Sequence, residues 1–185
     1  MENKQLRIIE TAHKLFLRHG YKKVTMSDIA EALDVSRPTL YASFQNKEAI
    51  FSALAKMHLE ANIAKLPALL ETKKTLRKKL ECIFDVWIIE PFASVIDSEN
   101  GKDLLENGST YAPTEIAKVY TEFESQLVQL LKPEFKKRKD LSAQDIAHIL
   151  MLATKGLKMS TDTLEELRRM TDGLISMTVA VVEKD

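Results

Sequence analysis

Residues 25–47, TMSDIAEALDVSRPTLYASFQNK, read as two short helices joined by a tight turn. Thr25 is a favourable N-cap for the first helix, and Asp28 three residues later completes a capping box. Apolar residues then recur at helical spacing, and Ser36 can cap a second helix. The stretch therefore predicts a helix-turn-helix unit in which Leu40 faces the core.

The second of these helices leaves Arg37, Thr39 and Tyr41 off its buried face. Arginine and threonine side chains hydrogen-bond base edges in the major groove, which admits one helix. Pro38 suits the start of a helix because the first amides have no intrahelical acceptor to lose. We therefore predict DNA binding, with Arg37 and Thr39 at base edges and Tyr41 at phosphate or sugar.

The composition is that of an ordinary folded protein: 185 residues, 45% hydrophobic and 29% charged, with a formal net charge of zero. A zero net charge argues against a protein that coats DNA non-specifically. The single cysteine, Cys82, excludes an intramolecular disulfide. The chain has no signal region and no run of ~20 apolar residues, so we predict a cytoplasmic protein without membrane association.

Catalytic motifs are missing from the sequence. The four histidines are scattered, without Cys or carboxylate partners at metal-ligand spacing. There is no Gly-rich phosphate loop and no recognisable nucleophile motif. The sequence therefore predicts no catalytic residues, no metal and no cofactor, and a protein that is not an enzyme. An all-α enzyme assembled from distant residues stays an alternative, which a metal or cofactor in the purified protein would support.

Apolar periodicity and helix-breaking residues predict about nine helices in an all-α fold. A first helix over residues 3–19 ends at Gly20. A fourth helix begins near residue 46 and ends near Leu66, where Pro67 interrupts it.

The second half of the chain is expected to be helical as well. Thr72 is the predicted cap of a helix to about residue 89, which Pro91 ends or bends. A short helix between loops is expected within residues 92–112, followed by a long helix over 113–133. The basic run at 136–139 is the predicted connector.

Two further capping patterns mark the final helices. Ser142 with Asp145 forms a capping box, and Thr163 with Glu166 caps the last helix. Both helices are long and amphipathic, so together they can pair with a second copy of the chain as a four-helix interface. The residues predicted at this interface are Ile149, Ala153, Gly156, Leu157, Leu167, Leu174 and Thr178.

The N-terminal residues resemble the TetR family of bacterial transcriptional regulators over residues 6–54, without a gap. The matching positions are Gly20, Tyr21, Thr25, Ile29, Ala30, Val35, Ser36, Thr39, Leu40, Tyr41, Phe44 and Lys47. Asp34 stands where the family usually has glycine. The turn residue expected in the left-handed region therefore carries a side chain, which Asp tolerates better than most residues.

The resemblance implies an organisation in three parts. These are a helix-turn-helix DNA-binding domain over 1–47, a connecting helix over 48–66, and a helical effector-binding and dimerisation domain over 67–185. It further implies a homodimeric repressor that a small molecule releases from a palindromic operator. By resemblance, Thr25 and Lys47 meet phosphates. The predicted DNA-binding residues are Thr25, Ser36, Arg37, Pro38, Thr39, Tyr41 and Lys47.

An effector pocket is expected among the middle helices, where aromatic and soft apolar side chains gather. The predicted ligand-binding residues are Phe84, Trp87, Phe92, Tyr111, Tyr120, Phe123, His148 and Met151. Few of them carry a charge, so we predict an apolar or aromatic effector. A second DNA-binding alternative stays open, in which a protein of this fold acts architecturally at many chromosomal sites without ligand control. Genome-wide occupancy distinguishes the two.

Overall fold

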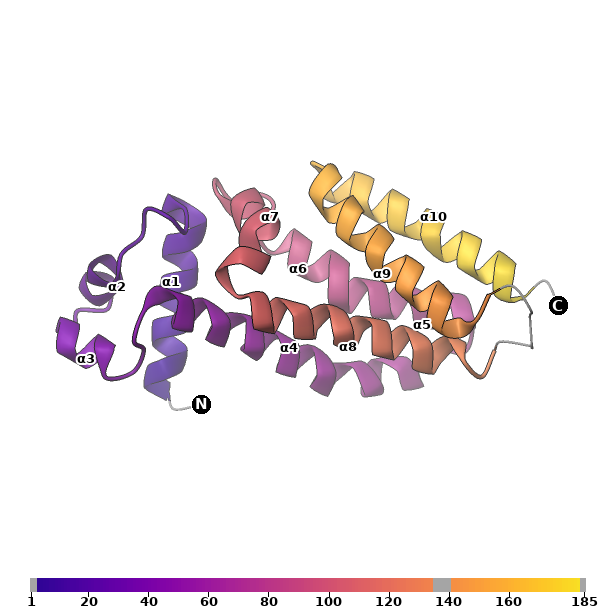
Figure 1. Cartoon of the computed structure of the whole chain (residues 1–185), viewed down its shortest axis with the longest axis horizontal. Helices are drawn as coiled ribbons and strands as arrows, with labels where there is room; N and C mark the ends of the chain where they lie inside the picture. Colours follow the sequence, from indigo (N-terminus) through magenta and orange to yellow (C-terminus); the bar gives the residue numbers. More distant parts are fainter. Residues whose placement is uncertain (1–2, 135–140, 184–185) are drawn as a thin grey trace. The chain divides into compact units, whose positions relative to one another are not determined.

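The computed structural model describes residues 3–134 and 141–183, so the predicted connector at 136–139 lies outside the described residues. Every regular element in these two ranges is helical (Figure 1). Helices α5, η1 and α6 follow one another without a break, so these ranges contain nine continuous helices. The predicted all-α fold class is confirmed.

Packing divides the chain into two compact units that are not consecutive in sequence. Unit 1 comprises residues 1–60 and 97–117, and unit 2 comprises residues 61–96 and 118–185. The functional division expected from the sequence stays a prediction. The structure shows, in addition, that a segment from the middle of the chain packs with the N-terminal helices.

Unit 1 is built around three N-terminal helices. Helix α1 (Asn3–His19) ends at Gly20, whose φ of 86° provides the left-handed residue that commonly follows a helix. Helix α2 (Met26–Ala32) and helix α3 (Arg37–Tyr41) follow as the helix-turn-helix pair. Their shared core includes Ile8, Ile9, Ala12, Phe16, Ile29, Ala30, Leu33, Leu40, Ile50 and Phe51.

The segment that leads into helix α7 (Gly101–Tyr111) is fastened to the end of α1. The backbone N–H of Asn100 donates to the carbonyl of Leu17 at 3.1 Å, and its side-chain amide donates to the carbonyl of Arg18 at 3.0 Å. The last carbonyls of a helix have no intrahelical donor, so Asn100 satisfies groups that would otherwise need water. This contact explains why segment 97–117 belongs to unit 1.

Tyr111 at the end of α7 lies in the core of unit 1. Its ring stacks on that of Tyr21, with centroids 3.9 Å apart and planes inclined by 20°, and Phe51 meets it edge-on at 5.8 Å. The Tyr111 hydroxyl donates to the Asp103 carboxylate at 3.2 Å. Tyr111 therefore packs with the N-terminal helices, and not with the unit 2 residues among which the sequence interpretation placed it.

Helix α4 (Lys47–Glu71) continues through Pro67, so its predicted end near Leu66 was wrong. Proline removes the hydrogen bond to the carbonyl four residues earlier, that of Ile63. Both Ile63 and Pro67 are exposed, so water can serve this carbonyl. The helix passes from unit 1 into unit 2 at residues 60 and 61.

The next helical run comprises α5 (Leu76–Phe84), the π-helical turn η1 (Asp85–Ile89) and α6 (Glu90–Ala93). Its N-cap is Thr75, whose hydroxyl accepts from the backbone N–H of Lys78, so the predicted cap at Thr72 was wrong. The Thr72 hydroxyl instead donates to the carbonyl of Leu69 at the end of α4.

The π-helical turn accommodates Pro91 within the helix. The Glu90 N–H donates to the carbonyl of Asp85, five residues earlier. In the same pattern the carbonyl of Val86 would accept from residue 91, but proline has no N–H. The buried side-chain amide of Asn62 donates to this carbonyl instead, at 3.2 Å. The helix therefore continues past Pro91 because α4 supplies the missing donor.

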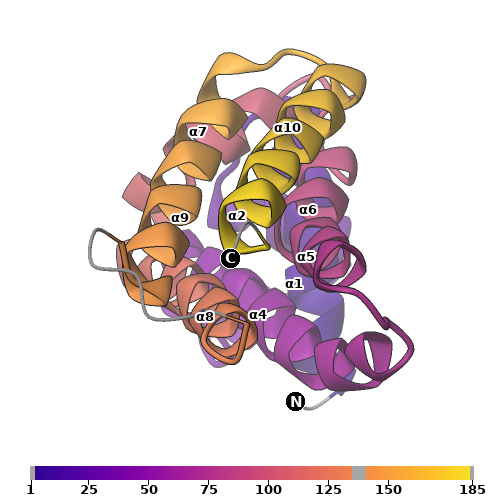
Figure 2. The same cartoon turned by 90° about the vertical axis from the view of Figure 1, so that its right-hand side faces the viewer.

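Three long helices complete the chain: α8 (Pro113–Leu131), α9 (Ala143–Ser160) and α10 (Leu164–Val182). The predicted capping box of Ser142 with Asp145 and the predicted cap Thr163 are both confirmed. Helices α9 and α10 pack side by side in unit 2 (Figure 2).

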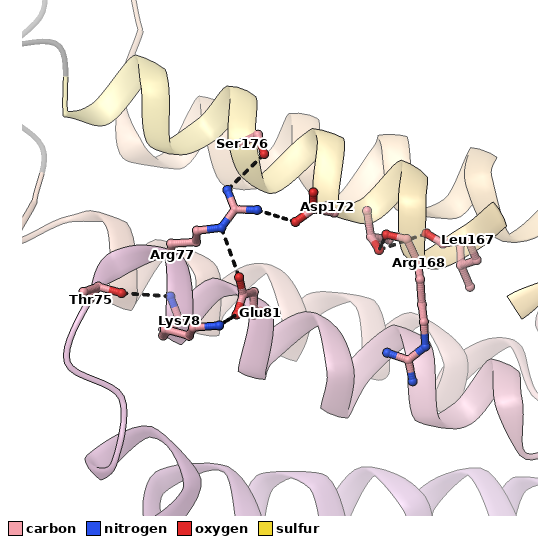
Figure 3. Close-up of polar contacts among 9 residues, drawn as sticks. Thr75, Arg77, Lys78, Glu81, Leu167, Arg168, Asp172 and Ser176 are labelled. Atoms are coloured by element: carbon pink, nitrogen blue, oxygen red, sulfur yellow. Dashed lines mark hydrogen bonds and ion pairs between the residues drawn. The ribbon is translucent and has the colours of Figure 1, made fainter. Parts of the chain in front are cut away.

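Helix α10 is also tied to α5 by an arginine. Figure 3 shows the Arg77 guanidinium reaching from α5 to Asp172 and Ser176 of α10. Its Nε atom lies 3.1 Å from the Glu81 carboxylate. The side chains of Asp172 and Ser176 are thus engaged within unit 2.

Candidate nucleic-acid interface

Helix α3 presents the residues predicted to read DNA. The Ser36 hydroxyl accepts from the backbone N–H of Thr39, which fixes the start of the helix as predicted. Leu40 is fully buried, whereas Arg37 and Pro38 are exposed and Tyr41 is 49% exposed. Thr39 is half-buried, and its hydroxyl lies 2.8 Å from that of Ser36. The apolar anchor Leu40 therefore leaves Arg37, Pro38 and Tyr41 facing outward.

The turn before α3 requires a left-handed residue. Asp34 supplies it with a φ of 54°, the one positive φ of a non-glycine residue in the described ranges. Aspartate visits this region more readily than most side chains. The conformation expected of this position from the sequence is confirmed.

Thr25 and Asp28 form the predicted capping box at the start of α2. The Thr25 N–H donates to the Asp28 carboxylate at 2.8 Å, and the Asp28 N–H donates to the Thr25 hydroxyl at 3.2 Å. These hydrogen bonds, first from the backbone and then from the hydroxyl of Thr25, lower the pKa of the Asp28 carboxyl. The box fixes the start of α2.

Lys47, at the first position of α4, already has partners within the protein. Its ammonium donates to the carbonyls of Tyr21 at 2.8 Å and Val24 at 3.1 Å, and lies 4.5 Å from the centre of the Tyr21 ring. This charge holds the turn between α1 and α2 against α4. Its contact with phosphate stays a prediction.

The predicted ligand-binding residues are only partly brought together. Phe84 and Trp87 flank Phe123, with ring centroids 5.5 and 6.5 Å away, and all three are buried in unit 2. The Trp87 indole N–H is buried without a hydrogen-bond partner. Phe92 and Met151 are also buried.

The other predicted ligand-binding residues lie elsewhere. His148 is exposed on α9, with its Nδ1 atom 3.2 Å from a carboxylate oxygen of Glu124. Tyr120 is half-buried, and the Lys155 ammonium lies 4.3 Å from the centre of its ring. Tyr111 belongs to unit 1.

Helices α9 and α10 expose apolar side chains. Ile149 is 52% exposed and Met159 61% exposed on α9, and Met177 is 60% exposed on α10. A Cβ added at Gly156 or Gly173 would meet nothing within 4 Å. Ala153, Leu157 and Leu174 are half-buried, but Leu167 and Thr178 are buried within unit 2, which places them in its core and not on its surface.

No helix in the described ranges is long and apolar enough to cross a membrane.

Comparison with known proteins supports the N-terminal motif. The sequence model of bacterial regulatory proteins of the tetR family matches residues 8–54. The transcriptional repressor ComR of Escherichia coli K12 is 34% identical over 106 residues, which cover 57% of this chain and 50% of ComR. The chain spans half or less of the length of the curated relatives that it matches.

Solved structures share the fold over nearly the whole chain. A protein from Saccharomonospora viridis described as a transcriptional regulator, in complex with choline, superposes with a TM-score of 0.75 at 20% identity, covering 95% of this chain and 97% of that one. The fatty acid degradation regulator FadR from Bacillus halodurans superposes with a TM-score of 0.73 at 19% identity, covering 95% of both chains. Residues 8–54 therefore carry the helix-turn-helix of the tetR family of bacterial regulatory proteins, and the chain as a whole shares the fold of solved regulators.

Proposed function

We propose that this protein is a sequence-specific DNA-binding transcriptional regulator that acts as a homodimeric repressor and is released by a small molecule. The observation that carries the proposal is helix α3, in which Leu40 is fully buried and Arg37, Pro38 and Tyr41 face outward. A helix with one anchored face and outward polar groups at its start suits entry into a major groove.

The residues around α3 have distinct proposed roles. Arg37 and Thr39 contact base edges, and Ser36 and Pro38 shape the start of the helix. Thr25 and Tyr41 contact phosphate or sugar. Because the Lys47 ammonium donates to carbonyls of the protein, we assign its phosphate contact to the backbone N–H at the start of α4.

Dimerisation is proposed through α9 and α10. Their exposed apolar side chains, with the open positions at Gly156 and Gly173, form a surface that a second copy can cover. A twofold axis would present two α3 helices to half-sites about 34 Å apart on a palindromic duplex. One five-residue helix reads few bases, so the pair supplies the required specificity.

The protein represses while it is bound to DNA. A ligand releases it by binding more tightly to the conformation that cannot bind DNA, because this difference in affinity shifts the population of conformations. ComR is named a repressor, and one structural neighbour holds choline. In this chain we place an apolar or aromatic effector beside Phe84, Trp87 and Phe123. The unpartnered indole N–H of Trp87 supports this placement, because a buried donor gains most from a ligand acceptor.

The test is selection of bound sequences from random duplex DNA with the wild type, Arg37→Ala and the control Lys74→Ala, which removes an exposed cation of unit 2. The wild type should enrich a palindrome. Arg37→Ala should lose preference at one position per half-site, by about 1–3 kcal/mol. Equal preference at every position after this change would refute the assignment, and no enrichment by the wild type would refute the proposed function.

The effector is tested separately, by a thermal-shift screen of apolar and aromatic compounds on the wild type and on Trp87→Phe. A compound that raises the melting temperature of the wild type more than that of the variant supports the placement. A compound that stabilises both equally contradicts it.

A further inference from the structure

A pocket of about 260 Å³ lies beside the reading helix in unit 1. One wall comes from the first two turns of α1, and the other comes from the turn between α2 and α3 and from α3 itself. Its lining residues are Lys4, Arg7, Ile8, Leu33, Val35, Thr39 and Leu40. The pocket thus joins the start of α1 to Thr39, a residue proposed to contact base edges.

The pocket has an apolar floor and a cationic rim. Ile8 and Leu40 are buried beneath it, whereas Lys4 and Arg7 are exposed, three residues apart on one face of α1. Neither cation forms an ion pair with any other described residue. Lys47 differs, because protein carbonyls already surround its ammonium. The positive charge available beside α3 therefore includes the start of α1.

We propose that Lys4 and Arg7 bind the DNA backbone phosphates that flank the groove entered by α3. The inference rests on the proposed function. A sugar-phosphate strand borders the major groove on each side of an inserted helix, and most protein–DNA hydrogen bonds go to these strands. A phosphodiester oxygen at the mouth of the pocket would meet both cations, with Thr39 on the opposite wall.

The shape of the pocket favours a strand of DNA over a free small anion. Small-molecule sites enclose most of their ligand and measure about 300–1,000 Å³. This pocket is smaller, and both of its cations are exposed to solvent. Such an arrangement suits a DNA strand that passes over the rim of the pocket and is held in position by its other contacts with α3.

The test measures affinity for the selected duplex as a function of salt, by fluorescence anisotropy, for Lys4→Gln, Arg7→Gln, the double variant and Lys56→Gln. Lys56 is the matched control, because it is an exposed lysine of unit 1 that pairs with Glu60 and does not line the pocket. Each lost phosphate contact should reduce the slope of log K against log salt by about 0.9. The same relation gives roughly five- to tenfold weaker binding per charge near 0.1 M salt.

The weakening should be equal on specific and scrambled duplexes, because phosphates carry no sequence information. Arg7→Lys, which keeps the charge, should retain the wild-type slope of log K against log salt. Lys56→Gln should leave that slope unchanged. An unchanged slope in the double variant, with thermal unfolding like that of the wild type, would overturn the inference and leave the proposed function standing. Inorganic phosphate that displaces the duplex more than chloride at equal ionic strength, in the wild type but not the double variant, would show a free-anion site and also overturn it. A wild type that binds no duplex refutes the proposed function itself.

Discussion

Unit 1 and unit 2 expose different kinds of side chain. Around α3, unit 1 leaves Arg37 and Tyr41 outside a buried Leu40, and Lys4 and Arg7 lie nearby. On α9 and α10, unit 2 leaves apolar groups such as Met159 and Met177 in solvent. The first surface suits a polyanion, and the second suits another apolar surface. The chain therefore presents two chemically distinct surfaces.

The interiors differ as well. In unit 1 the helix starts are fixed by neighbours in sequence, as Thr25 and Asp28 show. In unit 2 the helical run through Pro91 depends on a hydrogen bond from Asn62 of α4 to the carbonyl of Val86, 24 residues later in the sequence. Both units have local caps and long-range hydrogen bonds. The long-range ones of unit 1, from Asn100 and Lys47, hold a helix end and a turn, whereas that of Asn62 serves a carbonyl inside a helical run.

The largest expected effect separates the two cores. Phe123→Ala should lower the free energy of unfolding of unit 2 by about 3–5 kcal/mol, because it leaves a cavity between Phe84 and Trp87. Urea unfolding followed by the fluorescence of Trp87, the single tryptophan, measures this directly. Leu40→Ala is the matched change in unit 1. If it moves the Trp87 transition as far as Phe123→Ala does, the two interiors are not energetically distinct.

A smaller effect tests the long-range hydrogen bond. Asn62→Leu should cost about 1–3 kcal/mol, because the buried carbonyl of Val86 loses its donor. Pro91→Ala restores a backbone N–H in the same region. The double variant should therefore lose less than Asn62→Leu alone, measured by urea unfolding as a double-mutant cycle. Strictly additive changes would show that Asn62 does not replace the missing amide.

Equivalent caps in the two units sharpen the contrast in function. Thr25→Ala and Ser142→Ala should each lower stability by about 1 kcal/mol, because each removes an N-cap hydroxyl. Only Thr25→Ala should also weaken DNA binding, since Ser142 lies in unit 2. Melting curves and anisotropy titrations of both variants provide the measurement. An equal loss of DNA affinity in the two variants would show that Thr25 does not contact DNA.

The smallest effect is a dependence on pH. Hydrogen bonds from Thr25 lower the pKa of the Asp28 carboxyl, and hydrogen bonds from Ser142 lower that of Asp145, each below the ordinary value of 3.8. Because the folded state favours the ionised form, this stabilisation is present above the ordinary pKa and is lost as the pH falls through the lowered one. Asp28→Asn and Asp145→Asn should therefore each flatten the fall in melting temperature below pH 4. If the melting temperature of both variants falls with pH as steeply as that of the wild type, these two carboxyl groups are not the source of the pH dependence.

The accuracy of sequence interpretation followed the range of the interactions. Thr25, Ser142 and Thr163 were predicted as caps because a cap needs only a residue three positions away. Thr72 was predicted as a cap, but Thr75 is the N-cap of α5, because either threonine can cap a helix and only the folded chain shows which one does. Pro67 was expected to end α4, but the helix continues through it at a position where Ile63 and Pro67 are both exposed.

The same distinction between local and long-range interactions applies to the predicted DNA-binding site. Arg37 and Tyr41 were expected to be outward because Leu40 fixes the face of a short helix. Lys4 and Arg7 were missed, because α1 shows only a periodic pattern and its proximity to Thr39 arises from folding. A basic pair three residues apart at the start of α1 was the available signal.

The sequence by itself determined the helical class, the helix-turn-helix and the caps, because periodicity and hydrogen bonds over three or four residues specify them. Tertiary structure alone decided that Asn100 and Tyr111 pack with the N-terminal helices. It also decided that Asn62 sustains the helix through Pro91 and that the Lys47 charge serves carbonyls within the protein. Each of these contacts joins residues more than 20 positions apart, and no periodic pattern in a single chain records which distant groups will meet.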